Sequence, residues 1–145
     1  MPERKLGIDY GDKRIGVAVS DPLGYTARGI ATIYWNGEDI DKATEKVRIL
    51  CEEYAADTIV VGLPLRTDGR NSLSGEKAIQ FAEEVRKKVR AEVVMRDERY
   101  TSVIANRILR ETGGGKDRKS GAADQMAAEI ILSDYLRYLK KDTEG

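Results

Sequence analysis

The sequence predicts an α/β fold: a five-stranded mixed sheet flanked by helices, with elements in the order β-β-β-α-β-α-β-α-α. Three observations support this prediction. The first 34 residues hold three runs with strand character, the apolar spacing then becomes that of a helix, and two later apolar strands alternate with helical segments. Short connections join antiparallel strands, whereas helical crossovers join parallel strands. We therefore expect a three-stranded antiparallel meander and two further strands that run parallel to each other and to the first strand.

The first two strands are predicted to form a β-hairpin. Two short apolar runs, at residues 6–8 and 15–19, flank a polar turn at residues 10–14. Asp9 closes the first of these strands, and a third strand is expected at residues 27–34.

The remaining elements follow from apolar spacing. Apolar residues fall at helical spacing from residue 40 to residue 54, and residues 58–62 form a β-branched run typical of a strand buried on both faces. Further on we expect a helix at 74–89, a strand at 92–96, a short helix at 101–111, a glycine-rich loop at 112–120 and a final helix at 121–139.

Length and composition indicate one domain, spanning residues 1–145, with 41% hydrophobic and 34% charged residues. No apolar run approaches the roughly 18 residues of a membrane span, so we expect a cytoplasmic protein that does not enter a membrane. The net charge is zero, so any attraction to nucleic acid must come from the local placement of charges. The single cysteine, Cys51, falls in a helical apolar stripe and is expected in the core.

The absence of histidine restricts the possible chemistry most strongly. It excludes Ser-His-Asp and Cys-His nucleophilic sites and zinc sites built on imidazole, and a single cysteine also excludes thiolate zinc. An enzyme of this composition must use carboxylates, lysine, tyrosine, hydroxyl groups or a hard, oxygen-bound metal ion such as Mg²⁺ or Mn²⁺.

Two carboxylates are placed where a structural role does not fully explain them. Asp9 ends a buried strand; it could cap the turn, take part in a phosphate-binding hairpin, or pair with a cation. Asp124 lies near the start of the last helix, where it could simply complement the helix dipole, but Ala127, Ala128 and Ile131 place it on or beside the face that packs on the sheet. Because ligands gather at the carboxyl ends of parallel strands, Asp9 and the segments after the last two strands are expected at one edge.

Four ordered blocks of the sequence resemble the motifs of the YqgF/RuvX family: LGIDYGDKRIGVAVSD, VVGLPLRTDG, DERYTS and ADQMAAEIILSDYL. The resemblance covers almost the whole chain and implies an RNase H-like fold and a metal-dependent nuclease that hydrolyses phosphodiester bonds. The family is assigned to processing of pre-16S rRNA. The resemblance also implies that Asp9, Glu98 and Asp124 are catalytic residues that bind two Mg²⁺ or Mn²⁺ ions, with Asp68 as an alternative to Glu98 for the third ligand.

Basic residues near these acids are candidates for binding the phosphates of a nucleic acid. With Tyr100, which could stack on a base, the candidates are Lys13, Arg14, Arg66, Arg70, Arg99, Lys116, Arg118 and Lys119. Tyr25, Tyr34 and Trp35 lack neighbouring basic residues in the sequence, so we expect them to pack in the core or in loops.

Three alternatives stay open from the sequence. The same chemistry could serve a Holliday junction resolvase, which would cut branched DNA as a dimer, whereas trimming an RNA end requires one site. A nucleotide-binding protein of the actin-like or sugar-kinase-like type would need a second lobe, for which 145 residues leave no room. The fold could also serve as a non-catalytic nucleic-acid-binding module. Ribosomal particles are expected partners of a pre-rRNA nuclease. The protein itself is expected to be a monomer or a homodimer.

Overall fold

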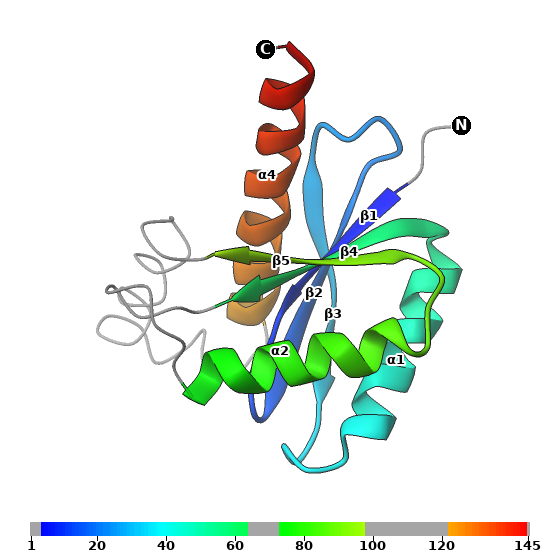
Figure 1. Ribbon diagram of the computed structural model, residues 1–145, viewed down its shortest axis with the longest axis vertical. Helices are drawn as coiled ribbons and strands as arrows, with labels where there is room; N and C mark the ends of the chain where they lie inside the picture. Colours follow the sequence, from blue (N-terminus) through cyan, green and yellow to red (C-terminus); the bar gives the residue numbers. More distant parts are fainter. Residues whose placement is uncertain (1–3, 64–72, 98–121, 145) are drawn as a thin grey trace.

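The computed structural model describes residues 4–63, 73–97 and 122–144. In chain order its elements are β1 (Arg4–Asp9), β2 (Arg14–Ser20), β3 (Ala27–Tyr34), α1 (Ile40–Glu53), β4 (Ala56–Leu63), α2 (Leu73–Arg86), β5 (Glu92–Asp97) and α4 (Ala122–Glu144) (Figure 1). The predicted helix at 101–111 and the glycine-rich loop at 112–120 lie outside the described residues.

The five strands form one mixed sheet in the order β3-β2-β1-β4-β5. β2 pairs antiparallel with both β1 and β3, whereas β4 pairs parallel with both β1 and β5. The predicted fold class, with its three-stranded meander and two parallel strands, is therefore confirmed. The order also places β1 at the centre, between the meander and the parallel pair.

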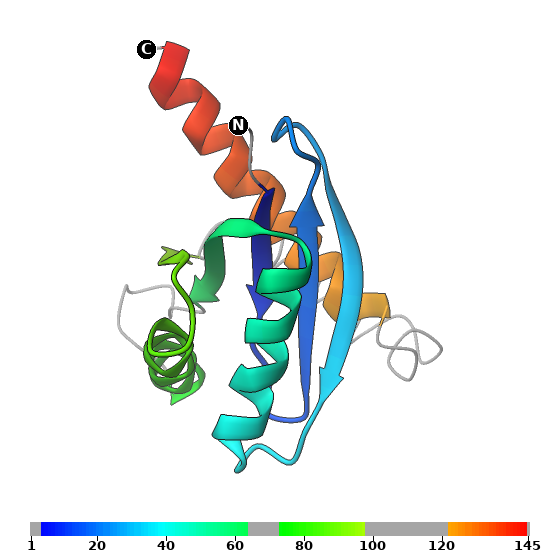
Figure 2. The same ribbon diagram turned by 90° about the vertical axis from the view of Figure 1, so that its right-hand side faces the viewer.

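Helices cover both faces of this sheet, giving three layers (Figure 2). α1 and α2 bury their apolar sides against one face, where Leu6 and Ile8 of β1 belong to the same core cluster as Val47 and Phe81. α4 covers the other face in a second apolar cluster that includes Leu132. No helix within the described ranges has both the length and the apolar character that crossing a membrane requires.

β4 confirms the expectation of a strand buried on both faces. Ile59 and Val61 belong to the core beneath α1 and α2, while Val60 between them belongs to the cluster beneath α4. Cys51 is also buried, as predicted, and its thiol donates a hydrogen bond to the carbonyl of Ala56 at 3.6 Å.

Element ends differ from the predictions by a few residues, and pairing explains the clearest case. Residue 14 was expected in the hairpin turn, but Arg14 is the first residue of β2 because it pairs with Tyr34, the last residue of β3. β4 likewise starts at Ala56, ahead of the apolar run, because that residue pairs with Arg4 of β1. Strand pairing thus extends both strands beyond their apolar segments.

α4 lies very close to the sheet because glycines line its path. A Cβ on Gly7 would come within 2.7 Å of Leu132 Cβ and 2.8 Å of the carbonyl oxygen of Ala128. A Cβ on Gly16 would overlap the carbonyl oxygen of Asp124. Two hydrogen bonds also join α4 to β3: Gln125 Nε2 donates to Thr32 Oγ1 at 3.0 Å, and the backbone N–H of Gly29 donates to Glu129 Oε1. The first turn of α4 is therefore held directly on the meander.

Candidate functional site

Asp9 lies on the face of the sheet that α4 covers. Side chains alternate between the two faces of a strand. Ile8 belongs to the core beneath α1 and α2, while Gly7 faces α4, so Asp9 falls on the α4 side. The residue is only 6% exposed, and it is the one acidic residue that is buried in the described part of the chain.

Asp124, near the other end of the described chain, lies close to Asp9 in the fold. Gly16 is the partner of Asp9 across the β1–β2 ladder, and because Ile15 and Val17 face the opposite core, Gly16 also faces α4. The backbone of Asp124 rests on Gly16 without room for a Cβ. The fold therefore brings the first turn of α4 over the strand position opposite Asp9.

Arg14 adds a positive charge beside these two acids. Its Nε lies 3.5 Å from Asp124 Oδ2, and both side chains are partly exposed. Lys13, the residue before it, is exposed, and its carbonyl oxygen accepts a hydrogen bond from the backbone N–H of Trp35. Four of the predicted site residues, Asp9, Lys13, Arg14 and Asp124, thus lie together at this edge.

The other predicted site residues lie outside the described residues: Arg66, Asp68, Arg70, Glu98, Arg99, Tyr100, Lys116, Arg118 and Lys119. The strands that precede them are nonetheless placed. β4 lies between β1 and β5, so the end of β5 is two strand spacings, about 10 Å, from β1. Leu63 and Asp97, the last residues of β4 and β5, are paired with each other. β4 and β5 therefore end side by side at the carboxyl edge of the sheet.

The donor set of the site suits a hard divalent cation. Asp9 and Asp124 offer carboxylate oxygens, which Mg²⁺ and Mn²⁺ prefer, and a buried carboxylate is stabilised in its charged form by a cation. Among the described residues no three acidic or thiol side chains are grouped closely enough to bind a metal. A complete metal site of this composition would therefore need a ligand from another segment of the chain.

The hairpin turn next to Asp9 is held by aromatic contacts. The indole N–H of Trp35 donates to the carbonyl oxygen of Gly11 at 2.8 Å, and the Trp35 ring packs edge-on against Tyr10 with 5.8 Å between centroids. Phe81 of α2 packs against both rings. These contacts fix the turn to the end of β3 and to α2, and they account for the predicted packing of Trp35.

Tyr10 gives this hairpin a testable pH dependence. Burial, together with the charge of Asp12 and a hydrogen bond to it, raises the pKa of Tyr10 from 10.0 to about 12. An unfolded chain releases this proton near pH 10 while the folded chain keeps it, so the stabilisation is complete below pH 10 and is lost as the pH rises to about 12. We expect urea unfolding from pH 9 to 12 to show a smaller loss of stability in Tyr10→Phe than in the parent. Equal losses in both proteins would contradict this assignment.

Tyr34 departs from the sequence expectation. It was expected to pack in the core or a loop, but its side chain is 56% exposed at the end of β3. The reason is strand alternation: Ile33 takes the core position, so Tyr34 lies on the opposite face beside Arg14. The alternation of this strand could have indicated its exposure, although the neighbouring charges come from other elements.

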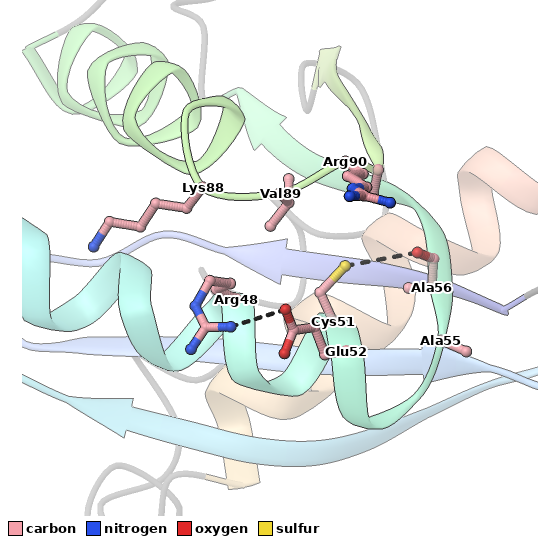
Figure 3. A pocket seen from close by; sticks show the side chains of 9 residues that line it. Arg48, Cys51, Glu52, Ala55, Ala56, Lys88, Val89 and Arg90 are labelled. Carbon is pink, nitrogen blue, oxygen red and sulfur yellow. Dashed lines mark hydrogen bonds and ion pairs between the residues drawn. The ribbon is translucent and has the colours of Figure 1, made fainter.

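A cavity of about 270 Å³ lies at the opposite end of the sheet and is separate from this site (Figure 3). Arg48, Cys51 and Lys88 line it, near Ala56, which pairs with the first residue of β1 rather than with Asp9 at its end. Arg48 is bound to Glu45 and Glu52, and Lys88 to Asp41 and Glu45. Arg48 and Lys88 are therefore already paired with acids, and the candidate functional site remains the one at the other end of the sheet.

The architecture and the two acids define the class of protein. A mixed sheet in the order β3-β2-β1-β4-β5, with an acid at the end of the central strand and another on the last helix, is the RNase H-like fold predicted from the sequence. Solved structures support it: RuvC of Thermus thermophilus in complex with a Holliday junction has a TM-score of 0.62 at 16% identity, covering 97% of each chain. The fowlpox virus Holliday junction resolvase, also bound to junction DNA, has a TM-score of 0.54 at 16% identity, covering 94% of this chain and 98% of the other.

The chain belongs to the RuvX family, whose model, described as "RuvX: Holliday junction resolvase", matches residues 3–138. A protein of Acetivibrio thermocellus named "Putative pre-16S rRNA nuclease" is 45% identical over 134 residues, covering 92% of this chain and 94% of that protein. A protein of Clostridium acetobutylicum with the same name is 43% identical over 133 residues, covering 92% and 97%. The resemblance found in the sequence is confirmed, and the chain is a nuclease of this family.

Proposed function

We propose that this protein is a metal-dependent endonuclease that processes the 5′ end of pre-16S rRNA during ribosome biogenesis, as a single domain acting in the cytoplasm. The observation that supports it most directly is that the backbone of Asp124 rests on Gly16, the ladder partner of the buried Asp9. The names of the relatives supply the substrate. The composition agrees, because a chain without histidine needs a base or Lewis acid of another kind.

In this proposal Asp9, Asp124 and Glu98 hold Mg²⁺ or Mn²⁺, with Asp68 as the second choice for the third ligand. When bound, a pair of such ions about 4 Å apart supplies an activated water molecule and stabilises the leaving oxygen of the cleaved phosphodiester. Glu98 directly follows β5, about 10 Å from β1, so its longer side chain suits the greater reach. Asp68 follows β4, the direct neighbour of β1.

The basic residues at the same edge would position the phosphate backbone. Arg14 and Lys13 flank the acids, and charge-assisted hydrogen bonds from arginine to phosphate are strong and directional. We extend this role, as a proposal, to Arg66, Arg70, Arg99, Tyr100, Lys116, Arg118 and Lys119. Such contacts bind nucleic acid with little dependence on its sequence, so the cut site must be selected by structure in the RNA or by a ribosomal partner.

A second candidate function is resolution of four-way DNA junctions. The printed description of the family and the junction-bound structural neighbours favour it. The two functions differ in their requirements: a resolvase makes two symmetric cuts and acts as a dimer, whereas a single cut in an RNA can be made by a monomer.

The experiment that tests the proposal compares two labelled substrates: a single-stranded RNA spanning the 5′ end of precursor 16S rRNA, and a four-way DNA junction. Each is incubated with the protein in Mn²⁺, in Mg²⁺ and in chelator. We expect metal-dependent cleavage of the RNA. Paired symmetric cuts in the junction, with the RNA intact, would assign the resolvase function instead. Failure to cut either substrate would contradict both functions and favour a nucleotide-binding or non-catalytic module.

A further inference from the structure

The face of the sheet that carries the candidate site continues beyond the start of α4. Gly16 and Thr32 are ladder partners beneath the first turn of this helix, where the backbone of Asp124 rests on Gly16. Thr32 accepts a hydrogen bond from the same turn. Two positions along the ladder, at the start of β2 and the end of β3, Arg14 pairs with Tyr34. Because side chains alternate between the two faces of a strand, this pair also lies on the α4 side of the sheet.

Arg14 connects the position of Tyr34 to the two acids. Directly opposite residues of an antiparallel pair have Cβ atoms about 4.5–5.5 Å apart, so the two side chains are neighbours. On its other side, Arg14 Nε lies 3.5 Å from Asp124 Oδ2. Asp9 lies on β1, two strand spacings, roughly 10 Å, from β3. The tyrosine, the arginine and the two acids therefore follow one another across a single face of the sheet.

The side chain of Tyr34 is exposed, and no described group covers its ring. It is 56% exposed, and β3 is an outer strand of the sheet. Tyr25 is 67% exposed, but the ammonium group of Lys140 lies 3.3 Å from its ring centroid. The guanidinium of Arg96 lies over the ring of Tyr138 in the same way, at 4.6 Å. Among the residues that the structure describes, Tyr34 is thus the exposed tyrosine whose ring makes no contact of this kind.

An exposed tyrosine beside an arginine suits an unpaired nucleotide. Proteins that bind single-stranded nucleic acid stack its bases on aromatic side chains, and any base can stack because every base has a π-face. Arginine binds phosphate through strong, directional hydrogen bonds. Packing does not account for Tyr34, since Ile33 takes the core position at the end of β3.

We propose that Tyr34 is a base-stacking residue of the candidate site. It binds the base of an unpaired nucleotide close to the cleaved phosphate, while Arg14 binds a phosphate between that base and the two acids. This inference rests on the proposed nuclease function and adds to it the path of the substrate, which runs from the acids across β2 to the outer strand β3. It also predicts little selection among bases at this position, because all of them can stack.

The test measures binding separately from cleavage, by fluorescence anisotropy in EDTA with a labelled single-stranded RNA of about 12 nucleotides. We expect Tyr34→Ala to raise the dissociation constant about tenfold, as loss of one base stack does, and Tyr34→Phe, which keeps the ring, to bind like the parent. Tyr34→Ala should leave the slope of log affinity against log salt unchanged, because the ring carries no charge. Arg14→Gln should lower this slope by about 0.7, the contribution of one neutralised phosphate.

Two controls make the result specific to a base on this ring. Tyr25→Ala removes a similarly exposed tyrosine from the loop before β3, at the opposite end of that strand, and should bind like the parent. A strand of abasic sugars, which has phosphates but no bases, should bind the parent and Tyr34→Ala with equal affinity. Unchanged affinity of Tyr34→Ala for the RNA, or no binding of the RNA by the parent, would overturn the stacking role. Equal weakening by Tyr34→Ala and Tyr34→Phe would also overturn it, because the contact would then belong to the hydroxyl group.

Cleavage of the precursor RNA by the parent distinguishes this inference from the proposed function. Cleavage by the parent, together with normal RNA binding by Tyr34→Ala, would overturn the stacking role and leave the nuclease function standing. Weakened binding by Tyr34→Ala, together with no cleavage by the parent, would support the stacking role and contradict the nuclease function.

Discussion

Replacing Asp9 by asparagine is expected to reduce metal-dependent cleavage by about three orders of magnitude, because one ligand charge is lost from a metal site while the shape of the side chain is kept. Asp9 is buried opposite Gly16 at the end of the central strand. The protein should still fold, because the change removes one of two neighbouring negative charges, those of Asp9 and Asp124, which repel each other when no metal is bound. We expect the thermal midpoint in EDTA to stay within a few degrees of the parent.

A second readout makes the Asp9 prediction independent of activity. Mn²⁺ or Mg²⁺ that binds the native state raises its stability, so the parent should melt at a higher temperature with metal than in EDTA, and Asp9→Asn should lose most of this shift. Asp57→Asn is the matched control, because Asp57 lies at the start of β4, at the far end of the sheet, where it pairs with Lys5. Cleavage by Asp9→Asn at the parental rate would exclude Asp9 as a metal ligand.

Gly16→Ala is expected to lower the free energy of unfolding by about 3 kcal/mol and to reduce cleavage at the same time. The added Cβ would overlap the backbone of Asp124, and a backbone atom cannot move aside as a flexible side chain can. The first turn of α4 would have to lift from the sheet and carry Asp124 away from Asp9. A displacement of about 1 Å at a catalytic group can reduce the rate about a hundredfold.

Urea unfolding and cleavage assays, run where every variant remains folded, check this prediction. Gly24→Ala is the control: Gly24 has a φ of +77°, so alanine there is strained by about 1 kcal/mol, but the nearest atom to its Cβ, Leu136 Cδ2, is 4.0 Å away. It should lose stability and keep its activity. If Gly16→Ala is as stable as the parent, α4 does not rest on β2 as described.

Much of the fold could be predicted from local sequence pattern. β3 was expected at its observed bounds, and β4 was recognised as buried on both faces because residues 58–62 lack polar alternation. Both results depend on spacing within one element, which the sequence displays directly. Element ends were less accurate, since Arg14 and Ala56 belong to strands through their partners rather than through their own side chains.

The candidate site, like the fold, could be predicted from the sequence only in part. Asp9 and Asp124 stood out because each carboxylate shares a face or a strand end with apolar neighbours, and motif order linked them to the family. Their meeting at Gly16 could not be predicted, because it depends on how closely α4 approaches β2. Tyr34 was expected to pack in the core or a loop, but it is exposed at the end of β3 because Ile33 takes the core position.

The sequence by itself determined the fold class and the family, and it proposed the acidic residues of the site, because periodicity and motifs are properties of neighbouring positions along one chain. The tertiary structure alone decided which of those residues share a surface. Strand register placed Tyr34 beside Arg14, and the glycines beneath α4 placed Asp124 over the partner of Asp9. The physical reason is that register and close packing are set by contacts between segments far apart in the chain, which no local pattern encodes.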